Sequence, residues 1–287
     1  MRLKYLFIGV LICQLQVLTA QNAQSVSLLW KISGNNLKQS SYLYGTIHLQ
    51  DERVFFMEEI VFKYIDMCDA FAIEVILDEI DPARIQNKIQ MKNNSLRDLM
   101  TNEEYLQVDE YMKTKTGQPL MFYNKMKPFF IATMLMQQEL GKERELAMDL
   151  FFLNYAKNAN KLIFGLETFE EQIKAVDKIS LKDQTIMLMK VTEESENQNT
   201  GIEKFINTYI SQNIEHLYDL TAQDTVMPSK SAKYFIDKRN IRMTKEIIKL
   251  SEKHSVFVAV GAAHLGGPSG IIVLLRKKGY NVEPVFW

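Results

Sequence analysis

Two of the four histidines in this 287-residue chain occur in the same local pattern, at opposite ends of the sequence. In each pattern an apolar run is followed by a glycine, and the histidine comes three residues after that glycine. The first pattern is "YLYGTIHL", with Gly45 and His48, and the second is "VFVAVGAAHLGG", with Gly261 and His264. Glycine permits the backbone to turn sharply as it leaves a strand. We therefore expect both imidazoles to lie on the rim of a sheet, where they are free to do chemistry.

Two acidic residues occur in comparable places. Glu74 lies in the apolar run "AFAIEVI", and Glu167 ends the run "LIFGLE". Open α/β sheets gather ligands at the carboxyl ends of their strands. Two imidazoles and one or two carboxylates at such an edge suit a divalent metal. The order His48, Glu74, Glu167, His264 also indicates a faint duplication, with one strand–Gly-x-x-His unit in each half of the chain.

The chemistry that this set predicts is hydrolysis. A metal with an open coordination position lowers the pKa of bound water and polarises a carbonyl group, and a free carboxylate beside it can act as a general base. One Gly-x-x-His alone is too common to predict a site, so the hypothesis depends on the pair. The pattern does not identify the metal, and acid–base chemistry without a metal stays open.

The hydrophobic patterns predict an α/β fold. Its central mixed sheet takes strands from both ends of the chain, and a long helical region lies in the middle. Thr101 with Glu104 and Thr168 with Glu171 form capping boxes, which indicate two helix starts. The strands are expected within residues 27–49, as a pair joined by a turn at 34–36, and at 70–76, 162–167, 256–260 and 282–286. Helical patterns cover residues 54–68, much of 82–160, most of 174–253, and 268–278.

The first twenty residues, "MRLKYLFIGVLICQLQVLTA", have the layout of a secretory signal peptide. A basic start precedes a short apolar stretch and a small residue, Ala20. We expect cleavage there, which leaves residues 21–287 as a single domain with no membrane anchor and a net charge of −3 instead of −1. The product should then be periplasmic or extracellular. Its one remaining cysteine, Cys68, is expected to be a buried, inert thiol.

Composition narrows the class of partner. The chain is 47% hydrophobic and 24% charged, and its formal net charge is −1. This is the composition of an ordinary globular protein, and nothing in it indicates binding to nucleic acid or to an anionic membrane surface. The expected partner is a peptide or a small-molecule substrate.

Several segments together resemble one known family over nearly the whole of residues 21–287. They are "YLYGTIHLQDERVF", "AFAIEVILD", "KPFFIATML", "AMDLFFLNYAKNANKLIFGLETFEEQ", "KRNIRM" and "VFVAVGAAHLGGPSGIIVLLRKKGYNVEPVF". In this order they are similar to the TraB/GumN family, which is related to the Tiki metalloproteases and more distantly to the erythromycin-esterase and ChaN-like folds. The last segment is the most specific.

The resemblance implies a metal-dependent hydrolase, in the first place a peptidase, with Mn²⁺ or Co²⁺ and with Zn²⁺ as a further possibility. His48, His264 and Glu74 would be the metal ligands. Glu74 and Glu167 would be catalytic acids, Glu167 by orienting a ligand or acting as base, and Arg239 of the pair Arg239–Asn240 would stabilise an oxyanion. Two alternatives remain: a non-catalytic protein that sequesters a peptide or haem-like ligand, and a metal-free esterase with histidine as base.

Some residues have a simpler interpretation from the sequence alone. Without the resemblance, Arg239 follows two charged residues and would be assigned to a solvated charge run. Asp149 in "AMDLFF" is either a buried acid that holds an active-site group or part of an exposed helix face. His216 and His254 are expected to be surface or capping residues.

Overall fold

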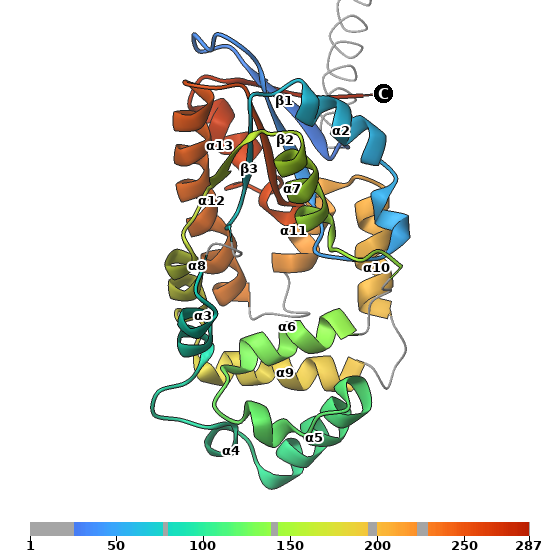
Figure 1. The fold of residues 1–287 in the computed structure, drawn as a ribbon. Helices are drawn as coiled ribbons and strands as arrows, with labels where there is room; N and C mark the ends of the chain where they lie inside the picture. Colours follow the sequence, from blue (N-terminus) through green and yellow to red (C-terminus); the bar gives the residue numbers. More distant parts are fainter. Residues whose placement is uncertain (1–25, 77–79, 139–142, 195–199, 223–228, 287) are drawn as a thin grey trace, which may run out of the picture.

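The computed structural model describes residues 26–76, 80–138, 143–194, 200–222 and 229–286, so the expected signal peptide lies outside the described residues. Figure 1 shows a sheet at one end of the molecule and a group of helices at the other. The predicted α/β class is confirmed: a six-stranded mixed sheet has the order β4-β3-β5-β2-β1-β6. Its strands are β1 (Leu29–Ser33), β2 (Ser41–Thr46), β3 (Ala70–Ile73), β4 (Leu162–Gly165), β5 (Val256–Gly261) and β6 (Asn281–Pro284).

The first two strands form the expected hairpin. β1 pairs antiparallel with β2, in a register that sets Leu29 opposite Tyr44. Gly34, Asn35 and Asn36 all have positive φ, at 80°, 48° and 63°. Glycine and asparagine tolerate this left-handed backbone better than other residues do. The residue types of the turn therefore account for its position.

The central pairing joins the two ends of the chain. β2 and β5 run parallel, with Gly45 opposite Val260 and Thr46 opposite Gly261. β3 pairs parallel with β5 on its other side and with β4 beyond. The carboxyl ends of these four strands therefore meet at one edge of the sheet. Both strand–Gly-x-x-His units lie on neighbouring strands, as their repetition predicts.

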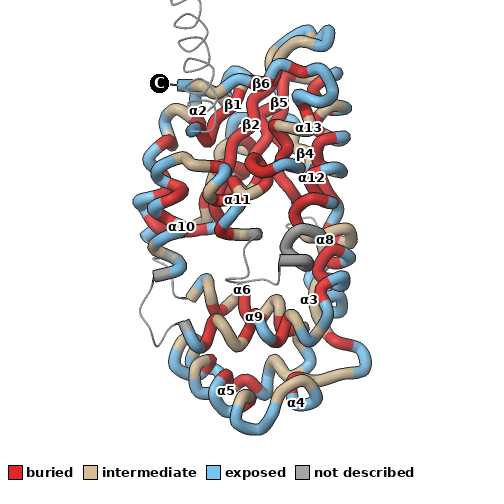
Figure 2. Tube along the Cα trace, turned by 180° about the vertical axis from the view of Figure 1, so that it is seen from behind, coloured by how far each residue is buried: buried red, intermediate tan, exposed pale blue. Residues whose placement is uncertain are grey.

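Helices cover both faces of the sheet, with α2 and α7 on one side and α12 and α13 on the other (Figures 1 and 2). α7 contacts α2 and β3, and α12 contacts α13 and β5. The elements around the sheet are η1 (Glu52–Phe55), α2 (Glu58–Asp66), α3 (Pro82–Ile89), α7 (Met148–Asn158), α8 (Phe169–Val176), α10 (Thr200–Ile210), α11 (Ile214–Ala222), α12 (Ser229–Ser251), η4 (Ala262–His264) and α13 (Ile271–Lys277).

The main core is the sheet itself. Strand β5 is buried along almost its whole length, as Figure 2 shows by colour. Such a strand, covered on both faces, has a continuous apolar sequence rather than an alternating one. Phe257 of β5 stacks on Phe71 of β3, with ring centroids 5.9 Å apart. The expected buried thiol belongs to this core, because Cys68 is 2% exposed and burial raises its pKa to about 12.

The middle of the chain builds a second apolar cluster, away from the sheet. Its elements are α4 (Leu96–Leu99), α5 (Asn102–Thr116), η2 (Leu120–Tyr123), α6 (Pro128–Gln138) and α9 (Leu181–Glu194). Val108, Met112, Leu120, Leu135 and Leu188 are each fully buried there. This helical lobe has a core of its own, and in Figure 1 it lies below the edge at which the parallel strands end.

The two helix starts marked by capping boxes follow the predicted signals, whereas the helical segment predicted at 54–68 is divided into η1 and α2, and the start of the last helix is shifted. The capping boxes that begin with Thr101 and Thr168 are both present, at the starts of α5 and α8. The last helix, however, begins at Ile271 instead of near Pro268. Gly270 precedes it, and a Cβ on Gly270 would lie 2.3 Å from the carbonyl oxygen of Leu265. The chain between η4 and α13 is therefore folded tightly back on itself, which delays the helix.

Candidate active site

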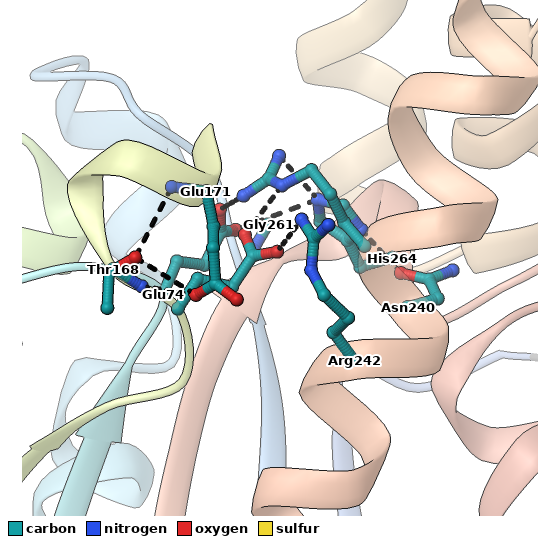
Figure 3. A network of polar contacts seen from close by, with 9 residues as sticks. Glu74, Thr168, Glu171, Asn240, Arg242, Gly261 and His264 are labelled. Atoms are coloured by element: carbon teal, nitrogen blue, oxygen red, sulfur yellow. Dashed lines mark hydrogen bonds and ion pairs between the residues drawn. The ribbon is translucent and has the colours of Figure 1, made fainter. Parts of the chain in front are cut away.

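All four predicted acid and histidine positions lie at the carboxyl edge of the parallel strands. Glu74 directly follows β3, Glu167 lies two residues beyond β4, and His48 lies two residues beyond β2. His264 ends the short helix η4, which continues directly from β5. Figure 3 shows Glu74, Gly261 and His264 next to one another at this edge, with Asn240 and Arg242 contributed by α12.

Glu74 is the centre of a buried polar network. It is 8% exposed, and its Oε1 accepts a hydrogen bond of 2.8 Å from the backbone N–H of Gly261. Its Oε2 accepts one of 2.5 Å from Nη2 of Arg239. Burial alone would raise the pKa of Glu74, but the charge of Arg239 and the hydrogen bond from Gly261 hold it well below its usual range. Glu74 is therefore a fixed carboxylate that spans the strand end and α12.

Arg239 is not part of a solvated charge run, because it is 3% exposed. Its Nε donates to Oε2 of Glu167 at 2.7 Å, in addition to the Nη2 contact with Glu74. The other oxygen of Glu167 accepts from Nη2 of Arg242, also at 2.7 Å. Two carboxylates and two guanidinium groups thus neutralise each other, which is what burying charge requires. Since both oxygens of Glu167 bind arginines, this geometry supports a positioning role for Glu167 over a role as base.

His264 does not lie on an open rim, because it is 6% exposed. Its Nδ1 lies 2.5 Å from Oδ1 of Asn240, and the amide nitrogen of Asn240 donates to the carbonyl oxygen of Ser269 at 2.9 Å. The amide orientation is set by that second bond, so Nδ1 of His264 carries the hydrogen. Its Nε2 then remains an acceptor, 3.4 Å from Nη1 of Arg239. Burial lowers the pKa of His264 to about 4, which keeps the ring neutral.

His48 has a different environment from His264. Its side chain is 58% exposed, and its Nδ1 lies 2.6 Å from Oδ2 of Asp149. Asp149 is in the first turn of α7 and is 6% exposed, so of its two expected settings the buried one is correct. The negative charge of Asp149 raises the pKa of His48, and the charges of Glu74 and Arg239 also act on it. His48 therefore belongs to the same electrostatic centre as Glu74.

The glycines of the two units are not there for a left-handed turn. Gly45 is not among the residues with positive φ, and Gly261 has φ −51° and ψ 132°. Other residues adopt such backbone angles without strain. The expected reason for the glycines is thus wrong, and close approach replaces it. A Cβ on Gly45 would lie 3.0 Å from the Cα of Ala262, and one on Gly261 would lie 3.3 Å from Oε1 of Glu74.

Arg242 was not predicted as a site residue, and for Asp149 a role in holding an active-site group was one of two alternatives. A signal for each exists in the sequence. Asp149 is an acid among large apolar residues at the start of a helix, where burial would need a partner. Arg242 follows Arg239 by three residues, so both side chains lie on one face of a helix. His216 and His254 are half-buried, and the ring of His254 stacks on Phe164.

A cavity adjoins this network on the side of Glu167. Its volume is about 580 Å³, and its lining combines apolar and charged side chains. The apolar part includes Val75, Ile76 and Phe169, while Arg242 and Lys245 contribute positive charge. A cavity of this size, with apolar walls and a few charged groups, suits one or two side chains of a peptide or a small molecule.

The donor chemistry of the two histidines fits a divalent metal. Each ring has its Nδ1 bound to an oxygen, which is how proteins orient metal-binding histidines toward a metal through Nε2. Nε2 of His264 faces Nη1 of Arg239 at 3.4 Å, so a metal bound there would displace that contact. Within the described residues, no three histidine, cysteine or acidic side chains are already gathered as a metal-binding group. The acid beside Nε2 of His264 is Glu74, whose Oε1 lies 3.8 Å from it. The two imidazoles would therefore be the main ligands of a metal at this site. Glu74 lies beside them, and its Oε2 is already bound by Arg239.

The fold and this network define a class: an α/β protein with a polar, charge-balanced centre at the carboxyl edge of its parallel strands. A sequence model of the TraB/PrgY/gumN family matches residues 28–284. The chain therefore belongs to the TraB/PrgY/gumN family, as its sequence motifs indicate.

Curated relatives carry the name of a metalloprotease. The chain is 22% identical over 325 residues to Metalloprotease TIKI1 of Xenopus tropicalis, covering 92% of this chain and 63% of that protein. It is 20% identical over 332 residues to Metalloprotease TIKI1 of Homo sapiens, with 93% and 63% covered. With Metalloprotease TIKI homolog of Amphimedon queenslandica the identity is 19% over 324 residues, with 92% and 62% covered. The chain thus spans about three fifths of the length of these relatives.

Proposed function

We propose that the protein is an exported, metal-dependent hydrolase that cleaves peptide bonds. The observation that carries the proposal is the pair of imidazoles at the ends of neighbouring parallel strands, each held through Nδ1, so that the lone pair of Nε2 is the one that would bind a metal. The names of the relatives support a hydrolase of the protease class. His48, His264 and Glu74 would hold the metal, with Mn²⁺ or Co²⁺ as the first candidates and Zn²⁺ as a further one.

When bound, the metal would lower the pKa of a water molecule and polarise the scissile carbonyl. The roles of the chain's own groups follow from their contacts. Glu167 holds the guanidinium of Arg239 from one side and Glu74 holds it from the other. A guanidinium fixed in this way needs no reorganisation to stabilise an oxyanion, which is the main source of electrostatic catalysis. Glu74 has both oxygens bound, by Gly261 and Arg239, and its pKa is held low, so it would act as a fixed negative charge beside the metal, 3.8 Å from Nε2 of His264.

The central test is hydrolysis under metal control. The protein would be stripped with a chelator, and fluorogenic peptides of varied sequence would be incubated with and without added Mn²⁺ or Co²⁺. We expect cleavage only with metal, and mass spectrometry would identify the bond cut. Stoichiometric peptide binding without any cleavage under every metal condition would contradict the proposal, and it would favour a sequestering protein.

One observation favours a second candidate, a metal-free esterase. His48 is paired with a buried carboxylate through Nδ1, the arrangement that orients a catalytic base in serine hydrolases. Arg239 already supplies a fixed positive charge at the same centre. Hydrolysis of a simple ester in excess chelator, lost on His48→Gln, would support this candidate. Absence of ester hydrolysis in chelator would exclude it.

Export is the remaining part of the proposal. None of the helices in the described part of the chain is long and apolar enough to cross a bilayer. The N-terminal "MRLKYLFIGVLICQLQVLTA" is the feature that supports export. Mass spectrometry of the protein recovered outside the cytoplasm should find Gln21 at or near its N-terminus. An intact Met1 on that protein would contradict the proposal.

A further inference from the structure

We infer that Asp149 and Asn240 are positioning residues for the two histidines, and that they make the two Gly-x-x-His units chemically unequal. His48 is held by a carboxylate, whereas His264 is held by a neutral amide. The inference rests on the proposed function only for its consequence in metal binding. The orientation of the rings is a property of the chain itself and can be tested without a metal.

The carboxylate of Asp149 is buried, which is unfavourable for the stability of the fold. It is 6% exposed, and its second oxygen, Oδ1, is buried with no hydrogen-bond partner among the described residues. Its first oxygen binds Nδ1 of His48 at 2.6 Å. Burying a carboxylate with a single partner is unfavourable for stability, and an apolar residue at the start of α7 would fill this place more cheaply. The acid is therefore better explained by what it does to His48 than by the packing of α7.

An ionised carboxylate is an acceptor only, so Nδ1 of His48 must donate to Asp149. The hydrogen on Nδ1 is thereby fixed, and the ring is turned so that Nε2 points away from α7. Neighbouring side chains cover His48 much less than His264: the side chain of His48 is 58% exposed, and that of His264 is 7% exposed. The direction of the His48 ring thus depends on this one bond.

Asn240 orients the ring of His264 with an amide group instead of a carboxylate. Its amide nitrogen is bound to the carbonyl oxygen of Ser269, so only Oδ1 can face the ring. Nδ1 of His264 must then donate, as Nδ1 of His48 does. Arg239, the residue before Asn240, is 3.4 Å from the opposite ring nitrogen. A carboxylate in place of Asn240 would add a third negative charge next to Glu74 and Glu167, which explains why the amide suits this position.

A carboxylate partner makes an imidazole a more basic metal ligand than an amide partner does. Loss of such a partner typically lowers metal affinity by about 10- to 100-fold. We therefore expect Asp149 to contribute more to metal affinity than Asn240 does. The substitutions Asp149→Asn, Asp149→Ala and Asn240→Ala separate the charge from the hydrogen bond. Asp69→Asn is a matched control, because Asp69 is also a hydrogen-bonded acid, bound to Ser255 at the opposite end of β3.

The first measurement is the ¹⁵N spectrum of the metal-free protein labelled at histidine. The chain has four histidines, so single substitutions suffice to assign each ring. The spectra are recorded above pH 9, because Asp149 raises the pKa of His48 to about 9 and the ring must be neutral for its tautomer to be read. In the parent, His48 and His264 should both show hydrogen fixed on Nδ1. Asp149→Ala should give His48 a mixture of the two tautomers and leave His264 unchanged. Asn240→Ala should shift the Nδ1 signal of His264 without changing its tautomer, because Arg239 still faces Nε2, and it should leave His48 unchanged. A His48 spectrum unchanged in Asp149→Ala would overturn the inference.

The second measurement is titration of the same variants with Mn²⁺ or Co²⁺ alone. We expect Asp149→Ala and Asp149→Asn to raise Kd by about 10- to 100-fold, Asn240→Ala to raise it less, and Asp69→Asn to leave it unchanged. Equal affinity of parent and Asp149→Asn would contradict the unequal roles. If the parent itself binds no metal, the proposed metal-dependent function fails, while the ¹⁵N spectra still decide whether Asp149 and Asn240 position the rings.

Discussion

The two Gly-x-x-His units have the same sequence pattern and lie on adjacent parallel strands, but their surroundings differ. The unit of β5 is inside the protein: His264 is buried, and the backbone N–H of Gly261 binds Glu74. The unit of β2 lies nearer the surface, with His48 exposed and held by Asp149 of α7. A repeated motif therefore fixes where two side chains leave a sheet. It does not fix the dielectric environment or the partners that they meet.

The glycines show the same contrast. A Cβ on Gly45 would press on Ala262, the residue that follows Gly261, at 3.0 Å from both its Cα and Cβ atoms. A Cβ on Gly261 would meet the carboxylate of Glu74 at 3.3 Å. The glycine of β2 thus allows the two units to approach each other, and the glycine of β5 allows an acid to approach the backbone. One is a packing requirement, and the other belongs to the site.

The largest expected effect is loss of activity on removing either histidine. His48→Ala and His264→Ala should each reduce turnover by about 10²- to 10⁴-fold, and the double variant should be little worse, because groups that act as a unit are not additive. Metal titration should show the same pattern. His254→Ala is the control, since His254 lies outside the site. Parent-like metal affinity in either single variant would show that the two rings do not share a centre.

Stability should separate the same two substitutions. His264→Ala leaves the amide oxygen of Asn240 buried without its partner, which should cost about 1–3 kcal/mol. His48→Ala removes an exposed ring, but it leaves the buried carboxylate of Asp149 without its partner, which should cost more because an unpaired buried charge is less favourable than an unpaired amide oxygen. Urea unfolding of both variants measures the difference, and a smaller loss in His48→Ala than in His264→Ala would contradict it.

Glu74→Gln is expected to abolish turnover but to leave the protein folded, with a moderate loss of stability. The amide keeps the size of the side chain but removes the charge that faces Arg239, so a loss of about 1–3 kcal/mol is expected. Activity and urea unfolding should be measured on the same preparation. Full activity would show that Glu74 is only structural, and complete unfolding would assign it to the stability of the network instead of to the chemistry.

Alanine at the two glycines should act on different properties. Gly45→Ala must displace the backbone of Ala262, so we expect a loss of about 1–3 kcal/mol from overpacking. Gly261→Ala needs Glu74 to move by only a few tenths of an ångström, so stability should change little while activity falls. Thermal unfolding and peptide or ester hydrolysis on both variants would test this. The reverse assignment of the two losses would refute it.

The smallest effect concerns Tyr209, which contacts the first unit. Tyr209 is fully buried, and its hydroxyl donates to the carbonyl oxygen of Gly45 at 2.8 Å. The same hydroxyl lies 3.1 Å from that of Tyr44 and 3.2 Å from Sδ of Met148. Tyr209→Phe should therefore cost about 0.5–1.5 kcal/mol and leave the tautomer of His264 unchanged. Tyr155→Phe, which removes a bond to Asp66 near the surface, is the matched control. An equal loss in both variants would show that the buried contacts of the Tyr209 hydroxyl have no special weight.

The sequence by itself determined the class of the fold, its strands and the residues that meet at the sheet edge. Apolar runs and capping boxes are local signals, so β5 and the starts of α5 and α8 could be predicted directly. The repeated Gly-x-x-His pattern also predicted that both ends of the chain supply one edge. Parallel strands in one sheet end at the same side, so this inference does not depend on the strand order or on the strand boundaries.

Tertiary structure decided the partners. Arg239 is charged and follows charged neighbours, and its burial depends on two acids from β3 and β4, which are distant in sequence. Asp149 became a partner of His48 only because α7 packs near the end of β2. The contrast between His48 and His264 has the same origin, because solvent exposure is set by every element around a side chain. Local spacing places a residue on an element, whereas the assembled fold determines its charge, orientation and exposure.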